Sequence, residues 1–107
     1  MESMDWQPIS EARIWEEINS GVAVMNPQQE RMWDCVKILP TKWGEPWCGA
    51  ARDGVWAVAV LGQTVVWYDD IEEGFVSSPY EHYGTVAQSK SREMALDEAI
   101  QDLINRL

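Results

Sequence analysis

Basic side chains are scarce in this 107-residue chain, which has eight Lys and Arg residues against eighteen Asp and Glu and a formal net charge of −10. Binding to a nucleic-acid backbone requires clustered Lys and Arg to neutralise the phosphates. We therefore expect no direct nucleic-acid partner, and a basic protein is the partner that the charge favours. A strong acidic charge also serves solubility alone, and this second interpretation stays open.

Cysteine and histidine are nearly absent, which limits the metal and redox chemistry available to the chain. Cys35 and Cys48 are the only cysteines, and His82 is the only histidine. Their spacing matches neither a zinc site nor a CxxC redox pair. We interpret both cysteines as reduced, buried, small hydrophobic residues, and we expect no metal and no cofactor.

Long apolar runs and targeting segments are lacking as well. The longest stretch without charge covers residues 54–68 and is interrupted by Gly62-Gln63, so it falls short of the roughly 20 residues of a membrane helix. Residues 1–5 have neither the basic start nor the apolar centre of a secretory signal. We expect a cytoplasmic protein without membrane contact, folded as a single globular domain over residues 1–107.

Tryptophan, in contrast, is abundant, with seven in the chain. Indole buries a large apolar area in a core and also dominates many binding surfaces. Helical or strand periodicity assigns four of the seven mainly to the core: Trp15, Trp33, Trp56 and Trp67. Trp6 is left unassigned, and the remaining two lie in a loop broken by glycine and proline.

Capping signals predict two helices in the first third of the chain. Ser10 is expected to cap the first helix and Gly21 to end it. Asn26, followed by proline and with Gln29 in capping-box position, is expected to start a short second helix that reaches about Asp34. Residues 35–39 fit either a helix or a strand closed by proline, and we favour a strand.

A hairpin is the clearest element of the middle third. Two β-rich runs, residues 55–61 and 64–69, are separated by Gly62-Gln63, the glycine-first connection that a type II′ turn prefers. Both faces of the hairpin are apolar, so it should lie inside a sheet and be covered on both sides. Counting from the turn gives the cross-strand pairs Val60–Val65, Val58–Trp67 and Trp56–Asp69.

The last third is expected to contain an acidic turn, a polar stretch, an edge strand over residues 85–88 and a final helix from about Arg92, capped by Ser91 or Ser89. The apolar stripe of that helix should pack on the sheet: Leu96, Ala99, Ile100, Leu103, Ile104 and Leu107. The predicted fold class is α+β, with two N-terminal helices, an antiparallel sheet of three to four strands around the central hairpin, and a C-terminal helix.

The block at residues 66–75, followed by Tyr83-Gly84-Thr85, resembles a group of short, uncharacterised bacterial proteins that carry a WYNDIExGF-like block. In this chain Asp69 stands where those proteins have asparagine. The resemblance covers about the middle third of the chain and implies no activity, cofactor or catalytic residue.

The acidic block of Asp69, Asp70, Glu72 and Glu73 offers oxygen ligands that a divalent cation could use. Its spacing departs from an EF-hand loop, which places acids at alternate positions around a central glycine. We therefore interpret the block as a solvated turn or a protein contact and assign no metal ligand.

Aromatic residues outside the expected helices and strands are the best candidates for a recognition surface: Trp43, Trp47, Tyr80 and Tyr83. Beside acidic residues they would suit Lys or Arg side chains through ion pairs and cation–π contacts. The alternative is that Trp43 and Trp47 only cap the open end of the sheet. His82, between the tyrosines, could pair with a cysteine as base and nucleophile, but no third orienting group is recognisable.

Three functional hypotheses follow. The leading one is a small, non-enzymatic protein-binding module that neutralises a basic partner, as an immunity protein, inhibitor or antitoxin does. The alternative is a small-ligand-binding domain with an aromatic pocket, and the third is an enzyme that uses His82. No catalytic residue is assigned, and the chain is expected to be a monomer or a homodimer.

Overall fold

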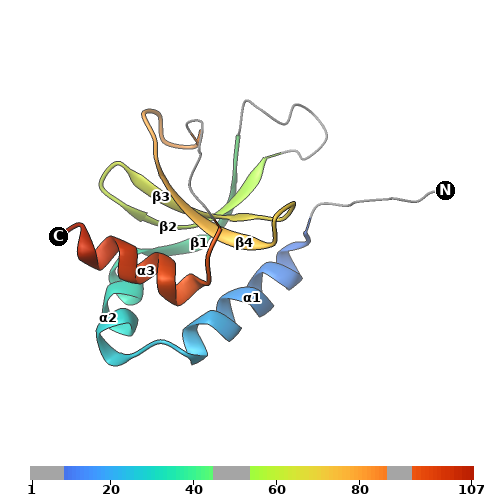
Figure 1. Ribbon diagram of the computed structural model, residues 1–107. Helices are drawn as coiled ribbons and strands as arrows, with labels where there is room; N and C mark the ends of the chain where they lie inside the picture. The colour runs from blue at the N-terminus through green and yellow to red at the C-terminus, as the bar shows by residue number, and fades with distance from the viewer. Residues whose placement is uncertain (1–8, 45–53, 87–92) are drawn as a thin grey trace.

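Four antiparallel strands in the order β1-β2-β3-β4 form a meander, with three helices on one face of the sheet (Figure 1). The computed structural model describes residues 9–44, 54–86 and 93–107. The elements are α1 (Glu11–Ala23), α2 (Pro27–Val36), β1 (Lys37–Trp43), β2 (Val55–Leu61), β3 (Thr64–Asp69), β4 (Gly74–Pro79) and α3 (Leu96–Asn105). The predicted α+β fold class is confirmed, including the C-terminal helix on the sheet.

Helix α1 starts as predicted but ends later. The Ser10 Oγ accepts a hydrogen bond of 3.2 Å from the Arg13 backbone N–H, as an N-cap should. Gly21 does not end the helix, which continues to Ala23. Its missing side chain instead makes room for α3, because a Cβ at Gly21 would lie 2.6 Å from the Leu96 Cβ.

Helix α2 has the predicted capping box. The Asn26 side chain accepts from the Gln29 backbone N–H at 2.8 Å, and the Gln29 side chain accepts from the Asn26 N–H at 2.9 Å. The helix runs to Val36, two residues beyond the predicted end, and β1 begins directly after it. Proline at position 40 does not close this strand, since β1 is an edge strand with a register shift between Lys37 and Thr41.

The hairpin of β2 and β3 has the predicted bounds, and Gly62 has the positive φ, 59°, that the first position of a type II′ turn requires. The predicted register holds at the turn, where Val60 pairs with Val65. It is wrong farther along, because an irregularity between Ala57 and Ala59 pairs Trp56 with Tyr68 instead of Asp69. A bulge of this kind exchanges the faces of the strand beyond it.

The sheet therefore has two buried apolar clusters, one on each face. Between the sheet and the helices, both Val58 and Ala59 join side chains from β3, β4 and all three helices. On the opposite face, the chain after β4 crosses the sheet and covers the second cluster (Figure 1). That second cluster consists of Trp43, Val55, Ala57, Val65, Trp67, Val76, Tyr80 and Val86.

The fourth strand, β4, is not where the sequence pattern places an edge strand. It covers the stretch expected to be polar loop and pairs with β3 along its whole length. Its two serines are buried: the Ser78 Oγ accepts from the Trp67 Nε1–H at 2.9 Å, and the Ser77 Oγ donates to Asp102 at 3.1 Å. Of the predicted strand 85–88, Thr85 forms only isolated bridges, and residues 87–88 lie outside the described residues.

Helix α3 begins at Leu96, later than predicted, and the Ala95 N–H donates to the Glu98 carboxylate at 3.1 Å. The proposed caps Ser89 and Ser91 lie outside the described residues. The apolar stripe packs as expected except at its end, where Leu107 is exposed. Within the described part of the chain, no helix is long and apolar enough to cross a membrane.

Candidate functional site

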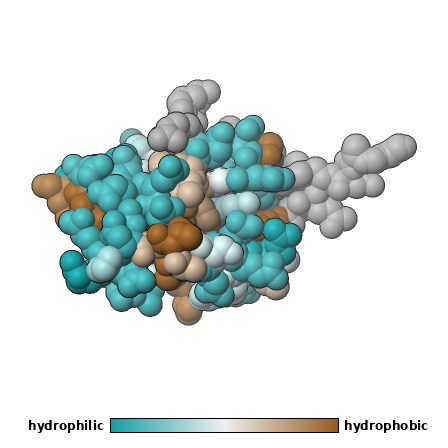
Figure 2. All heavy atoms as spheres, turned by 60° about the horizontal axis from the view of Figure 1, so that its bottom comes forward, coloured by the Kyte–Doolittle hydropathy of each residue, from teal (hydrophilic) through white to brown (hydrophobic). Residues whose placement is uncertain are grey.

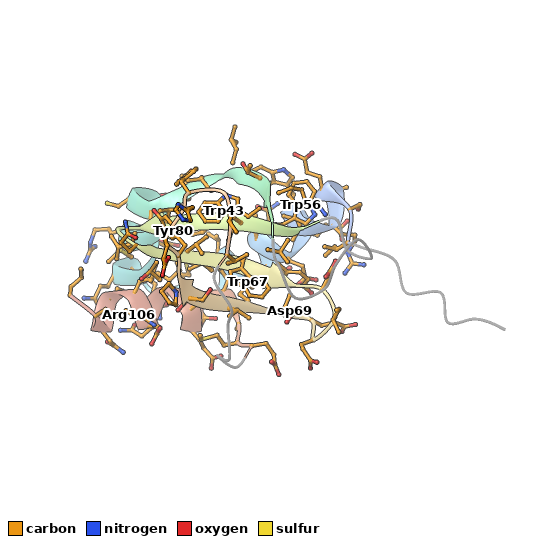
Figure 3. All side chains as sticks on the ribbon, turned by 90° about the horizontal axis from the view of Figure 1, so that it is seen from above. Trp43, Trp56, Trp67, Asp69, Tyr80 and Arg106 are labelled. Carbon is orange, nitrogen blue, oxygen red and sulfur yellow. The ribbon has the colours of Figure 1, made fainter. Side chains whose placement is uncertain are left out.

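Three of the aromatic residues proposed as a recognition surface, Trp43, Tyr80 and Tyr83, form a cluster of edge-to-face and tilted rings on the face of the sheet opposite the helices. Trp43 is only 1% exposed and contacts both tyrosines, with ring centroids 5.1 Å from Tyr80 and 4.7 Å from Tyr83. Figure 3 shows Trp43 and Tyr80 close together on this face. Trp43 is therefore a core residue that offers no surface to a partner, and Trp47 lies outside the described residues.

The two tyrosines of this group differ in role. The Tyr80 hydroxyl donates to the Gly62 carbonyl at 2.7 Å, which ties the chain after β4 to the hairpin turn. Tyr83 is 67% exposed and covers the Trp43 ring, so it is the member of the group that a partner can contact. His82 is also exposed.

A cysteine–histidine catalytic pair does not form among the described residues. His82 lies on the segment that crosses one face of the sheet, whereas Cys35 lies on α2 at the other face. Cys35 is exposed, contrary to the expectation of a buried thiol, and Cys48 lies outside the described residues.

The four tryptophans assigned to the core differ in how far they are buried. Trp33 and Trp67 are buried as predicted. Trp56 is half-buried, donates from its Nε1–H to the Ile9 carbonyl at 3.0 Å, and has the Lys42 ammonium 5.0 Å from its ring. Trp15 is 38% exposed, so its assignment to the core is wrong. Helical periodicity groups Trp15 with Ile14, but the indole is at the edge of that apolar stripe.

The acidic turn has two structural and two exposed carboxylates. The Asp69 Oδ1 accepts from the backbone N–H groups of Ile71 and Glu72, at 3.0 Å and 3.2 Å, and thereby shapes the turn. The Asp70 Oδ2 accepts from the Ile9 N–H at 2.9 Å, just before α1 begins. Glu72 and Glu73 are exposed. No group of three potential metal ligands occurs among the described residues.

Beside this turn lies a groove of about 450 Å³ between α1, the β3–β4 turn and the start of α3, which we call the acidic groove. Four carboxylates line it, from three stretches of the chain: Glu17 from α1, Glu73 from the β3–β4 turn, and Glu93 and Asp97 from the segment that starts α3. Its apolar lining includes Val24, Tyr68, Phe75, Met94 and Leu96. An apolar lining with carboxylates fits a cationic group carried on an aliphatic stem.

Tyr68 is the buried polar residue of the acidic groove. It is 6% exposed, and its ring packs against Phe75 with centroids 5.0 Å apart. Burial raises the pKa of the Tyr68 hydroxyl to about 12, and the nearby carboxylates of Glu17 and Glu73 add to the shift. The hydroxyl therefore stays protonated into the alkaline range in which an ordinary tyrosine ionises.

Among the residues that the structure describes, Arg13 pairs with a carboxylate of this groove. Arg13 contacts Glu16 at 3.1 Å and Glu17 at 3.2 Å, both along the exposed face of α1. Among the described residues, no cation pairs with the other three carboxylates of the acidic groove, those of Glu73, Glu93 and Asp97. Within the described part of the chain, Glu17 is therefore the one groove carboxylate with a cationic partner.

A second groove, of about 530 Å³, lies between α1, α2 and the start of β1, and we call it the apolar groove. Its lining includes Trp15, Val22, Trp33, Ile38 and Leu39, and Leu39 is 77% exposed. Asp34 and Lys37, which are 3.3 Å apart, lie at its polar side. Figure 2 shows the helix-bearing side of the molecule as largely hydrophilic, with hydrophobic residues gathered near its middle.

Of the proposed site residues that the structure describes, only Glu73 lines one of these two grooves. The sequence does not single out three of the groove carboxylates: Glu17, Glu93 and Asp97. Each lies on the polar face of an expected helix, or just before it, where exposed acids are ordinary. No local motif connects position 17 with positions 73 and 93–97. The available signal was the overall acidic charge, which indicates a cation-binding surface without locating it.

Comparisons with family models, curated proteins and solved structures gave no match for this chain. The fold defines the class: a small α+β domain with an antiparallel meander and helices on one face. The resemblance of the 66–75 block to short bacterial proteins stays a prediction.

Proposed function

We propose that this protein is a non-enzymatic binding module that neutralises a basic protein, in the manner of an immunity protein, inhibitor or antitoxin. The observation that carries the proposal is the acidic groove, where four carboxylates lie around an apolar lining and, among the described residues, only Glu17 has a cationic partner. Such a surface attracts a basic partner from a distance and then offers apolar contact. We place the complex in the cytoplasm, on sequence grounds, with the module as a monomer or a homodimer.

Affinity capture from the native host, followed by reconstitution with the purified partner, tests this proposal. We expect a partner of basic charge whose binding falls steeply as salt rises from about 0.05 M to about 0.5 M, because the Debye length shortens severalfold over that range. A partner that is acidic, or a complex that is indifferent to salt, contradicts the proposal.

Two charge-matched variants locate the contact. In the groove variant, Glu17, Glu73 and Glu93 become Gln and Asp97 becomes Asn. In the surface variant, four exposed acids elsewhere are replaced in the same way: Glu16, Glu30, Asp34 and Glu81. Both lose four negative charges, and we expect the groove variant to lose at least tenfold more affinity, since close pairs outweigh long-range attraction. Equal losses would mean that net charge alone governs binding.

The second candidate function is the binding of a small ligand. It is favoured by the apolar groove, whose 530 Å³ lies within the roughly 300–1,000 Å³ range of small-molecule sites and whose lining includes two indoles. Tryptophan fluorescence, screened against sugars, nucleotides and aromatic amines, tests it. A ligand that changes the wild-type emission should lose its effect in Leu39→Asp, which places a charge at the groove. Emission that no compound changes eliminates this candidate.

A further inference from the structure

The hydroxyl group of Tyr68 is a buried polar group without a hydrogen-bond partner among the described residues. The two other tyrosines differ, because Tyr80 donates to a carbonyl and Tyr83 is exposed to water. A buried hydroxyl without a partner costs free energy unless water or a ligand supplies the hydrogen bond. Tyr68 lines the acidic groove, so a ligand there can supply the missing hydrogen bond.

The charges of the groove specify the ligand's sign. Glu73 comes from the β3–β4 turn, Glu93 from the segment before α3, and Asp97 from its first turn. The carboxylates only accept hydrogen bonds, and the Tyr68 hydroxyl oxygen can accept one besides donating its own proton, so a donor that carries positive charge matches all of these groups.

The arrangement of these acceptors favours an ammonium over a guanidinium. A guanidinium is planar and binds best to both oxygens of one carboxylate in its own plane. An ammonium is compact, has three rotatable donors and suits acceptors that come from separate elements. The exposed side chain of Val24 and the half-buried side chain of Met94 provide apolar surface along which a four-carbon stem can lie.

We propose that the acidic groove receives a lysine side chain of the basic partner, whose ammonium is bound by the Tyr68 hydroxyl and by carboxylates that include Glu73. This inference rests on the proposed function and specifies the residue type that the partner inserts. It gives Tyr68 and Glu73 a role in recognition that a general acidic surface would not require.

Titration of the full chain with pentalysine amide and with pentaarginine amide, followed by NMR at low salt, tests the proposal. We expect the largest chemical-shift changes caused by pentalysine to occur in residues of the acidic groove. Pentaarginine, which carries the same number of charged side chains, should bind several-fold more weakly. Tyr68→Phe keeps the ring against Phe75 and removes only the hydroxyl. It should weaken pentalysine binding about tenfold and leave pentaarginine within about twofold, since a hydrogen bond to a charged group contributes about that much.

Glu73→Gln and Glu72→Gln form a matched pair on the same turn, because both are exposed and only Glu73 lines the groove. We expect the first to weaken pentalysine binding at least threefold more than the second. Circular dichroism will show whether Tyr68→Phe folds. If it does not, the two Gln variants alone test whether lysine binds in the acidic groove.

The lysine proposal is overturned if pentaarginine binds as tightly as pentalysine, or if Glu73→Gln behaves like Glu72→Gln. Salt-sensitive binding of both peptides with equal losses in the two Gln variants would leave the basic-partner function intact and place its contact outside the groove. If the native partner proves to be acidic, the proposed function fails, and the lysine proposal fails with it.

Discussion

Tyr68 combines burial with nearby negative charge, and both disfavour its ionised form. The unfolded chain releases the tyrosine proton near pH 10.0, whereas the folded chain holds it to about pH 12. A folded-state pKa above the unfolded value contributes stability that is complete below pH 10.0 and is lost as pH rises through about 12. The wild type should therefore lose more stability than Tyr68→Phe between these two pH values.

Urea unfolding of both proteins across this pH range measures the difference, and ultraviolet absorbance of tyrosinate follows the ionisation itself. The titration step near pH 12 should disappear in Tyr68→Phe. Parallel stability curves for the two proteins above pH 10 would contradict the shift.

Trp43 shows how a residue that looks like a binding residue in sequence can belong to the core. It follows a lysine and precedes a glycine, so nothing local marks it as buried. Its environment is made by chain distant in sequence, because Tyr80 and Tyr83 return over the sheet to cover it. Burial of this kind depends on tertiary contacts that periodicity cannot supply.

Trp43→Ala should therefore destabilise the fold by about 3–5 kcal/mol, the usual cost of removing a buried tryptophan. Tyr83→Ala removes an exposed ring in contact with the same indole and should cost about 1 kcal/mol. Urea unfolding followed by circular dichroism compares the two without relying on the lost fluorophore. A Trp43→Ala variant as stable as Tyr83→Ala would place the indole at the surface.

At the scale of elements, predictions are confirmed where all the residues that form the predicted contact lie within a few positions of one another. The Ser10 cap, the Asn26 capping box and the Gly62 turn each depend on neighbours within three positions. The register of β2 fails beyond Ala59, because a bulge is invisible in an alternating pattern. Strand β4 is missed for a related reason: its two serines find buried hydrogen-bond partners only in the fold.

Gly21 offers a test at this scale, because two effects of opposite sign compete there. Replacing a helical glycine with alanine normally stabilises by about 1 kcal/mol. Here the new methyl would lie 2.6 Å from the Leu96 Cβ, which cannot move without shifting α3, and overpacking of this kind costs about 1–3 kcal/mol. We expect Gly21→Ala to be net destabilising.

Ser20→Ala is the matched control, because its exposed site in the same helix gains propensity without a clash. Thermal unfolding should place it at or slightly above the wild type. If Gly21→Ala were as stable as Ser20→Ala, α1 and α3 would not pack as closely as described.

At the scale of the whole molecule, net charge and size set how far the carboxylates act. The chain carries −10 within a radius of gyration of 13.6 Å. The Debye length is about 30 Å at 0.01 M salt and about 8 Å at 0.15 M, so at low salt every charge repels every other. Self-repulsion destabilises the compact state, while the same field draws in a basic partner.

Salt should therefore act on folding and on binding in opposite directions. Raising sodium chloride from about 0.01 M to about 0.15 M shortens the Debye length as above, so we expect the unfolding temperature to rise while partner affinity falls. The groove variant, which has four fewer negative charges, should gain less thermal stability from salt than the wild type. Parallel thermal scans and binding titrations measure both responses. Salt that unfolded the protein would lower the unfolding temperature and the partner affinity together. A rise in unfolding temperature with a fall in affinity therefore indicates that salt screens repulsion within a folded acidic domain. A wild-type unfolding temperature that falls with salt would contradict this prediction.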